Sequence, residues 1–193
     1  NNANASISSS NIGVDILTTK QVANAYITNS GSITSSGTGI NLNPLTLSSL
    51  VLTPYLTTLT NNNGAIISGS NYGVYNAGTI DTFNNYGTIS GTGTDAVYST
   101  SGILTNGLNN YGSLAGNVAL GTNTLNLLAS SDAVVSNPTI AGNITGTTGS
   151  VINIGSTSDG TSVNHAAGDN ASVSQTKLAK GTTLTTIYSY TRG

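Results

Sequence analysis

Short runs of alternating apolar and polar residues recur along the chain, and many of them follow a turn that contains Asn and Gly. Alternation with a period of two is typical of β-strands that bury one face. In the turns, Gly supplies backbone angles that are closed to other residues, and Asn tolerates these angles better than most. The motif Asn-x-Gly-x-Ile/Leu therefore predicts a corner followed by a strand whose aliphatic side chain points inward. It occurs at 29–33, 62–66, 76–80, 85–89 and 110–114.

The spacing of these corners predicts a solenoid. Gly64, Gly87 and Gly112 are 23 and 25 residues apart, and Gly31 and Gly78 are the corner glycines of two further copies. A unit of this length with two turn signals predicts three short strands per coil, wound in parallel. One such coil cannot bury its own apolar face, so its stacked neighbours must supply the core. We therefore expect an all-β fold, a parallel β-helix (β-solenoid) of about 23–25 residues per coil.

An antiparallel β-sandwich is the alternative fold, because it also places a turn every 8–12 residues or so. It does not explain why one motif returns at the coil period. In the solenoid, equivalent positions of successive coils should stack inside. The expected stacks are Ile66 with Ile89 and Leu114, Val74 with Val97, and Phe83 with Leu108.

The tyrosines at equivalent coil positions are the candidate binding residues. If Val74 and Val97 point inward, the adjacent Tyr75 and Tyr98 must point outward. Tyr86 and Tyr111 are a second equivalent pair. A column of outward tyrosines surrounded by Asn and Thr suits stacking against sugars or contact with a protein. The alternative is an aromatic ladder that only stabilises the stack.

We expect all 193 residues to form a single elongated domain. The insertion in its solenoid is the most apolar stretch of the chain and is bracketed by Pro44 and Pro54. It is either a loop or strand pair folded onto the flank, or an exposed patch for self-association. The expected parts are a non-repeat N-terminal cap or arm (1–22), the solenoid (23–155) with its apolar insertion near 44–56, and a C-terminal cap or strand arm (156–193), in which 184–190 alternates like a terminal strand.

The composition excludes several functions. Charged residues make up 5% of the chain and the net charge is −2, so there is no basic surface to bind nucleic acid. No apolar run approaches the roughly 20 residues that span a bilayer. Hydrophobic residues are 36% of the chain and are spread regularly, which favours an ordered β-structure over a flexible polar stalk.

Candidate catalytic and metal-binding residues are sparse. One His and no Cys are too few for a transition-metal site, and no Glu is present to help. We expect His165, the single histidine, to be a solvated surface residue. Glycoside cleavage needs paired carboxylates, but Asp81 and Asp95 are 14 residues apart and do not share a coil position. We therefore predict no catalytic residue, no cofactor and no metal, and a polysaccharide-active enzyme is the least favoured hypothesis.

The repeats resemble those in the passenger domains of Gram-negative autotransporters, the type V secreted adhesins. The segment SNYGVYNAGTIDTFNNYGTISG (70–91) carries the resemblance most clearly, and the match covers about 23–155. The resemblance implies a right-handed β-helix on the bacterial surface or released from it, acting in adhesion, aggregation or biofilm formation. The chain begins at Asn1 rather than Met, which favours a processed passenger, a fragment or a free secreted subunit.

Two non-enzymatic hypotheses follow. The first is an extracellular structural or adhesive surface protein whose partners are host or bacterial glycans, proteins or other copies of itself. The second is a self-assembling subunit of an extracellular filament, joined by end-to-end stacking or by exchange of a terminal strand, because natural sheet edges are usually protected by charge and this chain has little.

Overall fold

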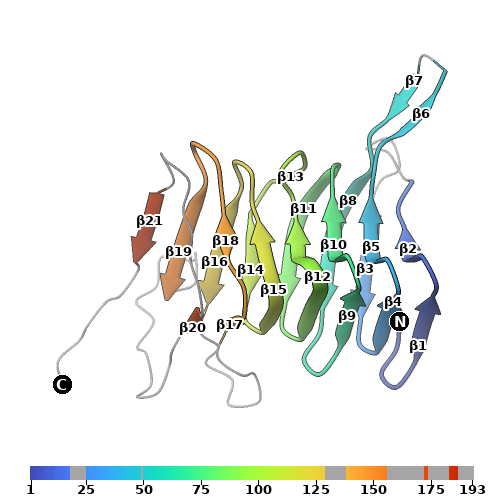
Figure 1. Ribbon diagram of the computed structural model, residues 1–193, viewed down its shortest axis with the longest axis horizontal. Coiled ribbons are helices and arrows are strands. Elements are labelled where there is room, and N and C mark those ends of the chain that lie inside the picture. The colour runs from blue at the N-terminus through green and yellow to red at the C-terminus, as the bar shows by residue number, and fades with distance from the viewer. Residues whose placement is uncertain (18–24, 49, 129–137, 156–171, 174–182, 187–193) are drawn as a thin grey trace.

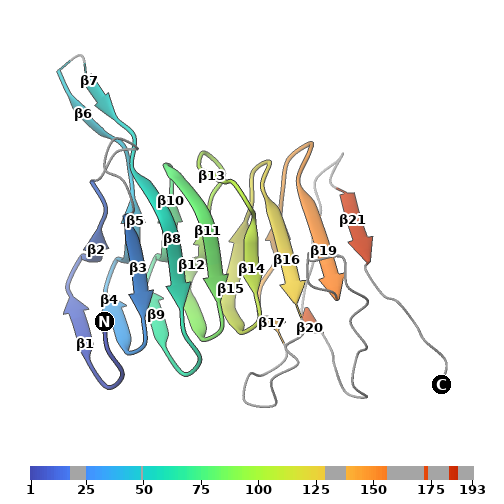
Figure 2. The ribbon, with the colours of Figure 1, turned by 180° about the vertical axis from the view of Figure 1, so that it is seen from behind.

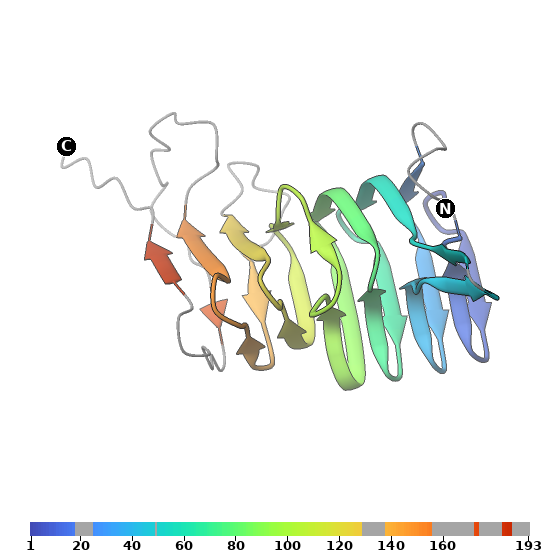
Figure 3. The same cartoon turned by 90° about the horizontal axis from the view of Figure 1, so that it is seen from above.

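The computed structural model describes residues 1–17, 25–48, 50–128, 138–155, 172–173 and 183–186. These residues form strands and turns and contain no helix. Except in one antiparallel hairpin, the strands pair in parallel with strands of the neighbouring coils, so the chain winds into a β-solenoid (Figure 1). The same row of stacked coils is seen from behind in Figure 2 and from above in Figure 3. The predicted fold class is confirmed.

Three parallel ladders, here called faces 1, 2 and 3, form the walls of the solenoid. Face 1 consists of β1 (Ser6–Ser9), β4 (Ser32–Ser35), β9 (Ile66–Gly69), the first parts of β12 (Thr88–Tyr98) and β15 (Ser113–Ala119), β17 (Thr139–Ile140) and β20 (Ser172–Val173). Face 2 consists of β2 (Ile12–Asp15), β5 (Thr38–Leu42), β10 (Tyr72–Asn76), the second parts of β12 and β15, and β18 (Ile144–Thr145). Face 3 consists of β3 (Tyr26–Asn29), β8 (Tyr55–Asn61), β11 (Thr79–Asn85), β13 (Ile103–Leu104) with β14 (Leu108–Asn110), β16 (Thr124–Leu128), β19 (Val151–Gly155) and β21 (Thr183–Thr186).

The coil length on face 1 is within one residue of the predicted 23–25. On face 1, Ile66 pairs with Thr88, which pairs with Ser113, which pairs with Thr139. These partners are 22, 25 and 26 residues apart along the chain. The described residues of the predicted N-terminal cap include β1 and β2, which lie in the first rungs of faces 1 and 2.

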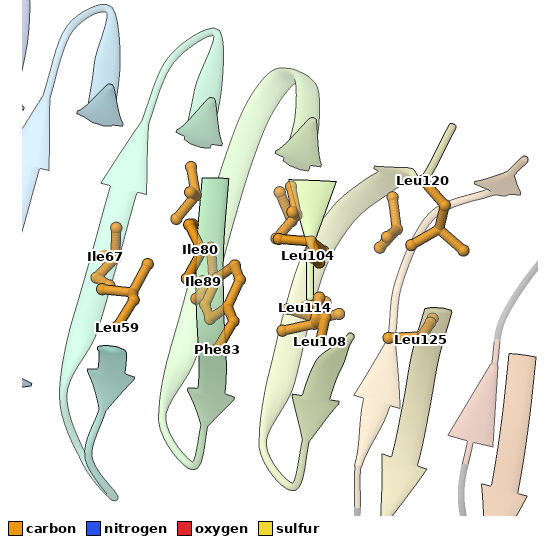
Figure 4. Close-up of a cluster of buried hydrophobic side chains, with 14 of the residues drawn as sticks. Leu59, Ile67, Ile80, Phe83, Ile89, Leu104, Leu108, Leu114, Leu120 and Leu125 are labelled. Carbon is orange, nitrogen blue, oxygen red and sulfur yellow. The ribbon is translucent and has the colours of Figure 1, made fainter. Parts of the chain in front are cut away.

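Aliphatic side chains from the three faces fill the interior (Figure 4). The expected stacks of Val74 on Val97 and of Phe83 on Leu108 are both present, and these four side chains are fully buried. The stacks extend further than expected. Face 2 adds Ile40, Val118 and Ile144, and face 3 adds Leu59, Leu125 and Ile152.

The expected inward position of Ile66 is wrong. Ile66 is 42% exposed, and Ile67 pairs with Ile89 inside the core. The cause is a one-residue offset in this copy of the motif. Ala65 lies where Gly31 and Gly87 lie in the neighbouring coils, because its carbonyl oxygen accepts the hydrogen bond from Thr88 as that of Gly31 accepts from Ile66. The turn before Ala65 is two residues longer than the equivalent turns, because three residues separate Asn61 from Ala65 and one separates Asn85 from Gly87, and Gly64 is one of the three.

A buried asparagine ladder runs through the corner between faces 3 and 1. Asn29, Asn61, Asn85 and Asn110 are fully buried and stack in register. The side-chain Nδ2 of the first three donates to the Oδ1 of the next coil, at 2.9 Å from Asn29 to Asn61, 2.9 Å from Asn61 to Asn85 and 2.7 Å from Asn85 to Asn110. Asn110 Nδ2 ends the ladder by donating to the Gly112 carbonyl oxygen at 3.1 Å. The Asn of the motif is therefore a core residue in the copies at 29–33, 85–89 and 110–114, and in the 62–66 copy the buried ladder residue is Asn61, one position before the motif. The polar atoms of the ladder are satisfied along the stack.

The apolar insertion is an antiparallel hairpin of β6 (Leu45–Leu47) and β7 (Leu50–Leu52). It occupies the corner between β5 and β8, where the other coils make shorter turns. The hairpin reaches away from the solenoid instead of lying along its flank (Figures 1 and 2). Of the two expectations for this segment, the exposed apolar patch is therefore the one that the structure supports.

Candidate functional site

Tyr75 and Tyr98 stack on the outer surface of face 2. Parallel pairing of β10 with β12 places them opposite one another, next to the buried pair Val74 and Val97. Their ring centroids are 5.2 Å apart and their planes differ by 3°. Strand alternation turns both rings outward, where they remain partly exposed.

A third tyrosine, Tyr72, completes a cluster that the sequence did not predict. Its ring centroid lies 5.2 Å from that of Tyr75 and 5.4 Å from that of Tyr98, tilted by 59° and 57°. Tyr72 lies on the same outer surface and closes one side of the stack. Because its register partner on β12 is Asp95 and not another aromatic residue, no repeat marks it in the sequence.

Asp95 brings a carboxyl group to this cluster. Burial raises the pKa of the Asp95 carboxyl above its ordinary value. Burial also raises the pKa of Tyr72, and the negative charge of Asp95 adds to that rise. The described residues contain no Lys or Arg, so no cationic side chain among them stabilises this carboxylate. We call Tyr72, Tyr75, Tyr98 and Asp95 the tyrosine cluster.

The geometry of the cluster limits how it can bind. The facing surfaces of Tyr75 and Tyr98 cover one another, so neither is open to a ligand. On the side away from Tyr75, the register partner of Tyr98 is Ala119 on β15. No aromatic residue continues the stack at this position of β15, so the stack ends at Tyr98. The partly exposed rings of the three tyrosines and the partly exposed carboxyl group of Asp95 are available together.

Tyr86 and Tyr111 form a second and separate stack. Their centroids are 4.7 Å apart with planes 12° from parallel, and they lie at the corner between faces 3 and 1, not beside the tyrosine cluster. The two equivalent pairs of tyrosines expected from the sequence therefore lie on different edges of the solenoid and do not form one column. A shallow cavity of about 380 Å³ borders this second pair and is lined by Asn63, Gly64, Tyr86, Gly87, Thr88, Gly112, Ser113 and Thr139.

The corner glycines serve packing and do not line the tyrosine cluster. A Cβ on Gly31, Gly78, Gly87 or Gly112 would lie 2.2–2.3 Å from a backbone carbonyl oxygen of the preceding coil. Gly64 differs, because it has a φ of +74° and open space around it. Its role is to adopt a left-handed backbone conformation in the longer turn.

A polar cluster on face 3 was also missed by sequence reasoning. The Tyr55 hydroxyl donates to the carboxylate of Asp81, and Thr105 Oγ1 donates to the same carboxylate at 2.8 Å. The hydrogen bond to Asp81 raises the pKa of Tyr55. These residues line a groove of about 430 Å³ with Thr53, Pro54, Thr79 and Ile103. Asp81 therefore differs from Asp95 of the tyrosine cluster, because two hydroxyl groups donate hydrogen bonds to the Asp81 carboxylate.

This difference predicts opposite effects of two matched substitutions. Folding raises the Asp95 pKa, so the folded state favours the protonated carboxyl, and this group opposes folding as the pH rises above about 4, where unfolded Asp titrates. Asp95→Asn should therefore raise the melting temperature at pH 7, with a gain that vanishes near pH 3. Asp81→Asn should lower it, because the acceptor for Tyr55 and Thr105 is weakened. Thermal unfolding followed by circular dichroism at both pH values measures the two effects. A fall for Asp95→Asn at pH 7 as large as that for Asp81→Asn would show that Asp95 is also held by donors.

Metal and membrane features were sought in the described part of the chain. It contains no group of three or more His, Cys, Asp or Glu side chains that could hold a metal ion. No helix within it is long and apolar enough to cross a membrane. His165 lies outside the described residues, so its expected solvent exposure stays a prediction.

Comparisons of the chain with family models, with curated proteins and with solved structures gave no match.

Proposed function

We propose that this chain is a non-enzymatic, extracellular scaffold protein that binds through its side wall, of the kind found in the passenger of an autotransporter-type surface adhesin. The observation that carries the proposal is the tyrosine cluster. It gathers three aromatic rings and one carboxyl group on a wall of short polar side chains, and the solenoid core holds them rigidly. The parallel β-solenoid with Asn-x-Gly corners supports the resemblance on which the surface location rests.

The chemistry of the cluster suits carbohydrates. A sugar ring packs its C–H face against an aromatic ring, and Tyr98 has a face beside Ala119 that no other ring covers. A neighbouring carboxyl group accepts hydrogen bonds from sugar hydroxyls, and charge-assisted hydrogen bonds are stronger than neutral ones. Two aromatic rings already packed together lose little side-chain freedom on binding, which favours affinity.

A glycan array probed with the purified chain tests this proposal. Tyr98→Ala should weaken binding about tenfold, since it removes the open ring face and half of the stack. Tyr98→Phe should retain most of the binding, because the ring is kept. Tyr111→Ala is the matched control, because it disrupts an equivalent stack on another edge and should leave binding unchanged. Equal binding by wild type and Tyr98→Ala would remove the cluster as the site, and release of soluble sugars from a panel of polysaccharides would contradict the non-enzymatic proposal.

A filament subunit is the second candidate. It is favoured by the charge distribution, because the described strands carry Asp side chains and no Lys or Arg, and lysine is the residue that most often protects sheet edges from one another. Electron microscopy of the purified chain at high concentration tests it. Rods many coils long would support end-to-end assembly, and single short particles would exclude it.

A further inference from the structure

The hairpin formed by β6 and β7 has one face made only of leucine. Its register pairs Leu45 with Leu52 and Leu47 with Leu50. Cross-strand partners point to the same side of a ribbon, and residues two apart do so as well. All four leucines therefore lie on one face, and Thr46 and its partner Val51 lie on the other.

This leucine face has no cover within the described part of the molecule. Leu45, Leu47 and Leu50 are 37%, 51% and 57% exposed, and the hairpin stands away from the solenoid wall (Figures 1 and 2). An isolated two-stranded ribbon is marginally stable in water and needs something to pack against. A second apolar layer would supply that support.

We propose that the leucine face is the interface of a homodimer, in which the hairpins of two copies pack face to face about a two-fold axis. A two-fold interface uses the same patch on both partners, so the patch must be complementary to itself. Two leucine-covered ribbons meet this condition, because stacked sheets about 10 Å apart interdigitate apolar side chains from both inner faces. The position of the hairpin, beyond the wall, lets two of them meet before the solenoids collide.

The charge pattern favours a second copy over a membrane or a charged protein. The chain has no Asp, Glu, Lys or Arg between Lys20 and Asp81. The hairpin itself therefore brings no charge to an interface between two copies. It likewise offers no basic residue of its own to attract an anionic lipid surface, and no charge of its own with which a charged partner could pair.

The size of the patch predicts a weak dimer. A standard interface buries about 800 Å² on each partner, and three exposed leucines with the partly buried Leu52 supply much less. We therefore expect a dissociation constant on the order of 10–100 µM. On a crowded surface, weak contacts of this kind between neighbouring molecules would add up through multivalency.

Sedimentation of the complete chain between about 5 and 500 µM tests the interface, since this range brackets the expected dissociation constant. Wild type should shift from monomer to dimer. The double variant Leu47→Thr/Leu50→Thr should weaken dimerisation at least about tenfold, and threonine retains the β-propensity of the strands. Val51→Thr makes the same kind of change on the opposite face and should dimerise like wild type. Circular dichroism should show the same β-structure in all three proteins.

Three results would overturn the proposal. Wild type could remain monomeric over the whole range, or the double variant could associate as wild type does, which would place the contact at the ends of the solenoid or elsewhere. The chain could also bind phosphatidylcholine vesicles through Leu47 and Leu50 while staying monomeric in solution, which would identify a lipid surface as the occupant. Glycan binding by the tyrosine cluster is measured separately, so failure of the dimer and failure of the proposed function are distinguishable.

Discussion

Replacing Asn85 with Ala is expected to lower the free energy of unfolding by about 3–5 kcal/mol, because buried polar groups left unsatisfied cost about 1–3 kcal/mol each. Asn85 Nδ2 donates to Asn110 Oδ1 at 2.7 Å and to the Ser113 carbonyl oxygen at 3.2 Å, and its Oδ1 accepts from Asn61 at 2.9 Å. Alanine removes all three hydrogen bonds. Asn61 Nδ2 retains its hydrogen bond to the Thr88 carbonyl oxygen at 3.1 Å, whereas Asn110 Oδ1 loses its donor in the buried corner.

The neighbouring residue provides the matched control. Asn84 points outward, and its Oδ1 accepts one hydrogen bond, at 3.0 Å, from Asn109 on the next coil. Asn84→Ala should cost less than about 1 kcal/mol, since water can replace that partner. Urea unfolding of the two variants gives both values. Similar losses of unfolding free energy for Asn85→Ala and Asn84→Ala would show that the buried ladder stabilises the chain no more than an outward pair of asparagines does.

Replacing Phe83 with Ala is expected to destabilise the chain by about 3–5 kcal/mol, the usual cost of deleting a buried aromatic side chain. Phe83 is the single phenylalanine and is fully buried on face 3, between Leu59 and Leu108 (Figure 4). The two leucines belong to the coils on either side, so the cavity would separate three successive coils. In a solenoid, where stability comes from contacts between neighbouring coils, such a cavity weakens two interfaces at once.

Two further substitutions calibrate this effect. Phe83→Leu restores much of the volume and should cost less than about 1.5 kcal/mol. Thr82→Ala changes the adjacent outward residue and should stay within about 0.5 kcal/mol of wild type. Chemical unfolding under the same conditions measures all three. If Phe83→Ala lost no more stability than Thr82→Ala, the side chain would not lie in the core.

The repeat made the solenoid predictable, because each buried stack recurs with the coil. Val74 with Val97, and Phe83 with Leu108, could be aligned from the corner glycines alone. Ile66 could not be placed, because the motif glycine of this copy, Gly64, lies one residue before Ala65, which takes the corner position, and a shift of one residue in a strand turns every side chain to the other face.

The tyrosine cluster could be predicted only in part for a related reason. Tyr75 and Tyr98 repeat, so the coil period reveals them. Tyr72 and Asp95 are opposite one another but differ in kind, so no repeat links them until the strands are paired. The hairpin was recognised as an insertion from its apolar residues and prolines. Its leucine face became visible only with the register of Leu45 on Leu52 and Leu47 on Leu50.

The central claim is that residues one coil apart in the sequence lie one rung apart in space, in unbroken parallel register. Distances between spin labels test it most directly, and the chain has no native cysteine to interfere. Thr60, Asn84, Asn109, Asn126 and Asn153 form one column in register on face 3, and all of them except Asn126 are partly exposed. At about 4.8 Å per rung, labels at positions 60 and 84 should be about 5 Å apart and labels at 60 and 153 about 20 Å apart. A 60–153 distance well beyond this value, or no strong coupling between 60 and 84, would contradict the parallel solenoid.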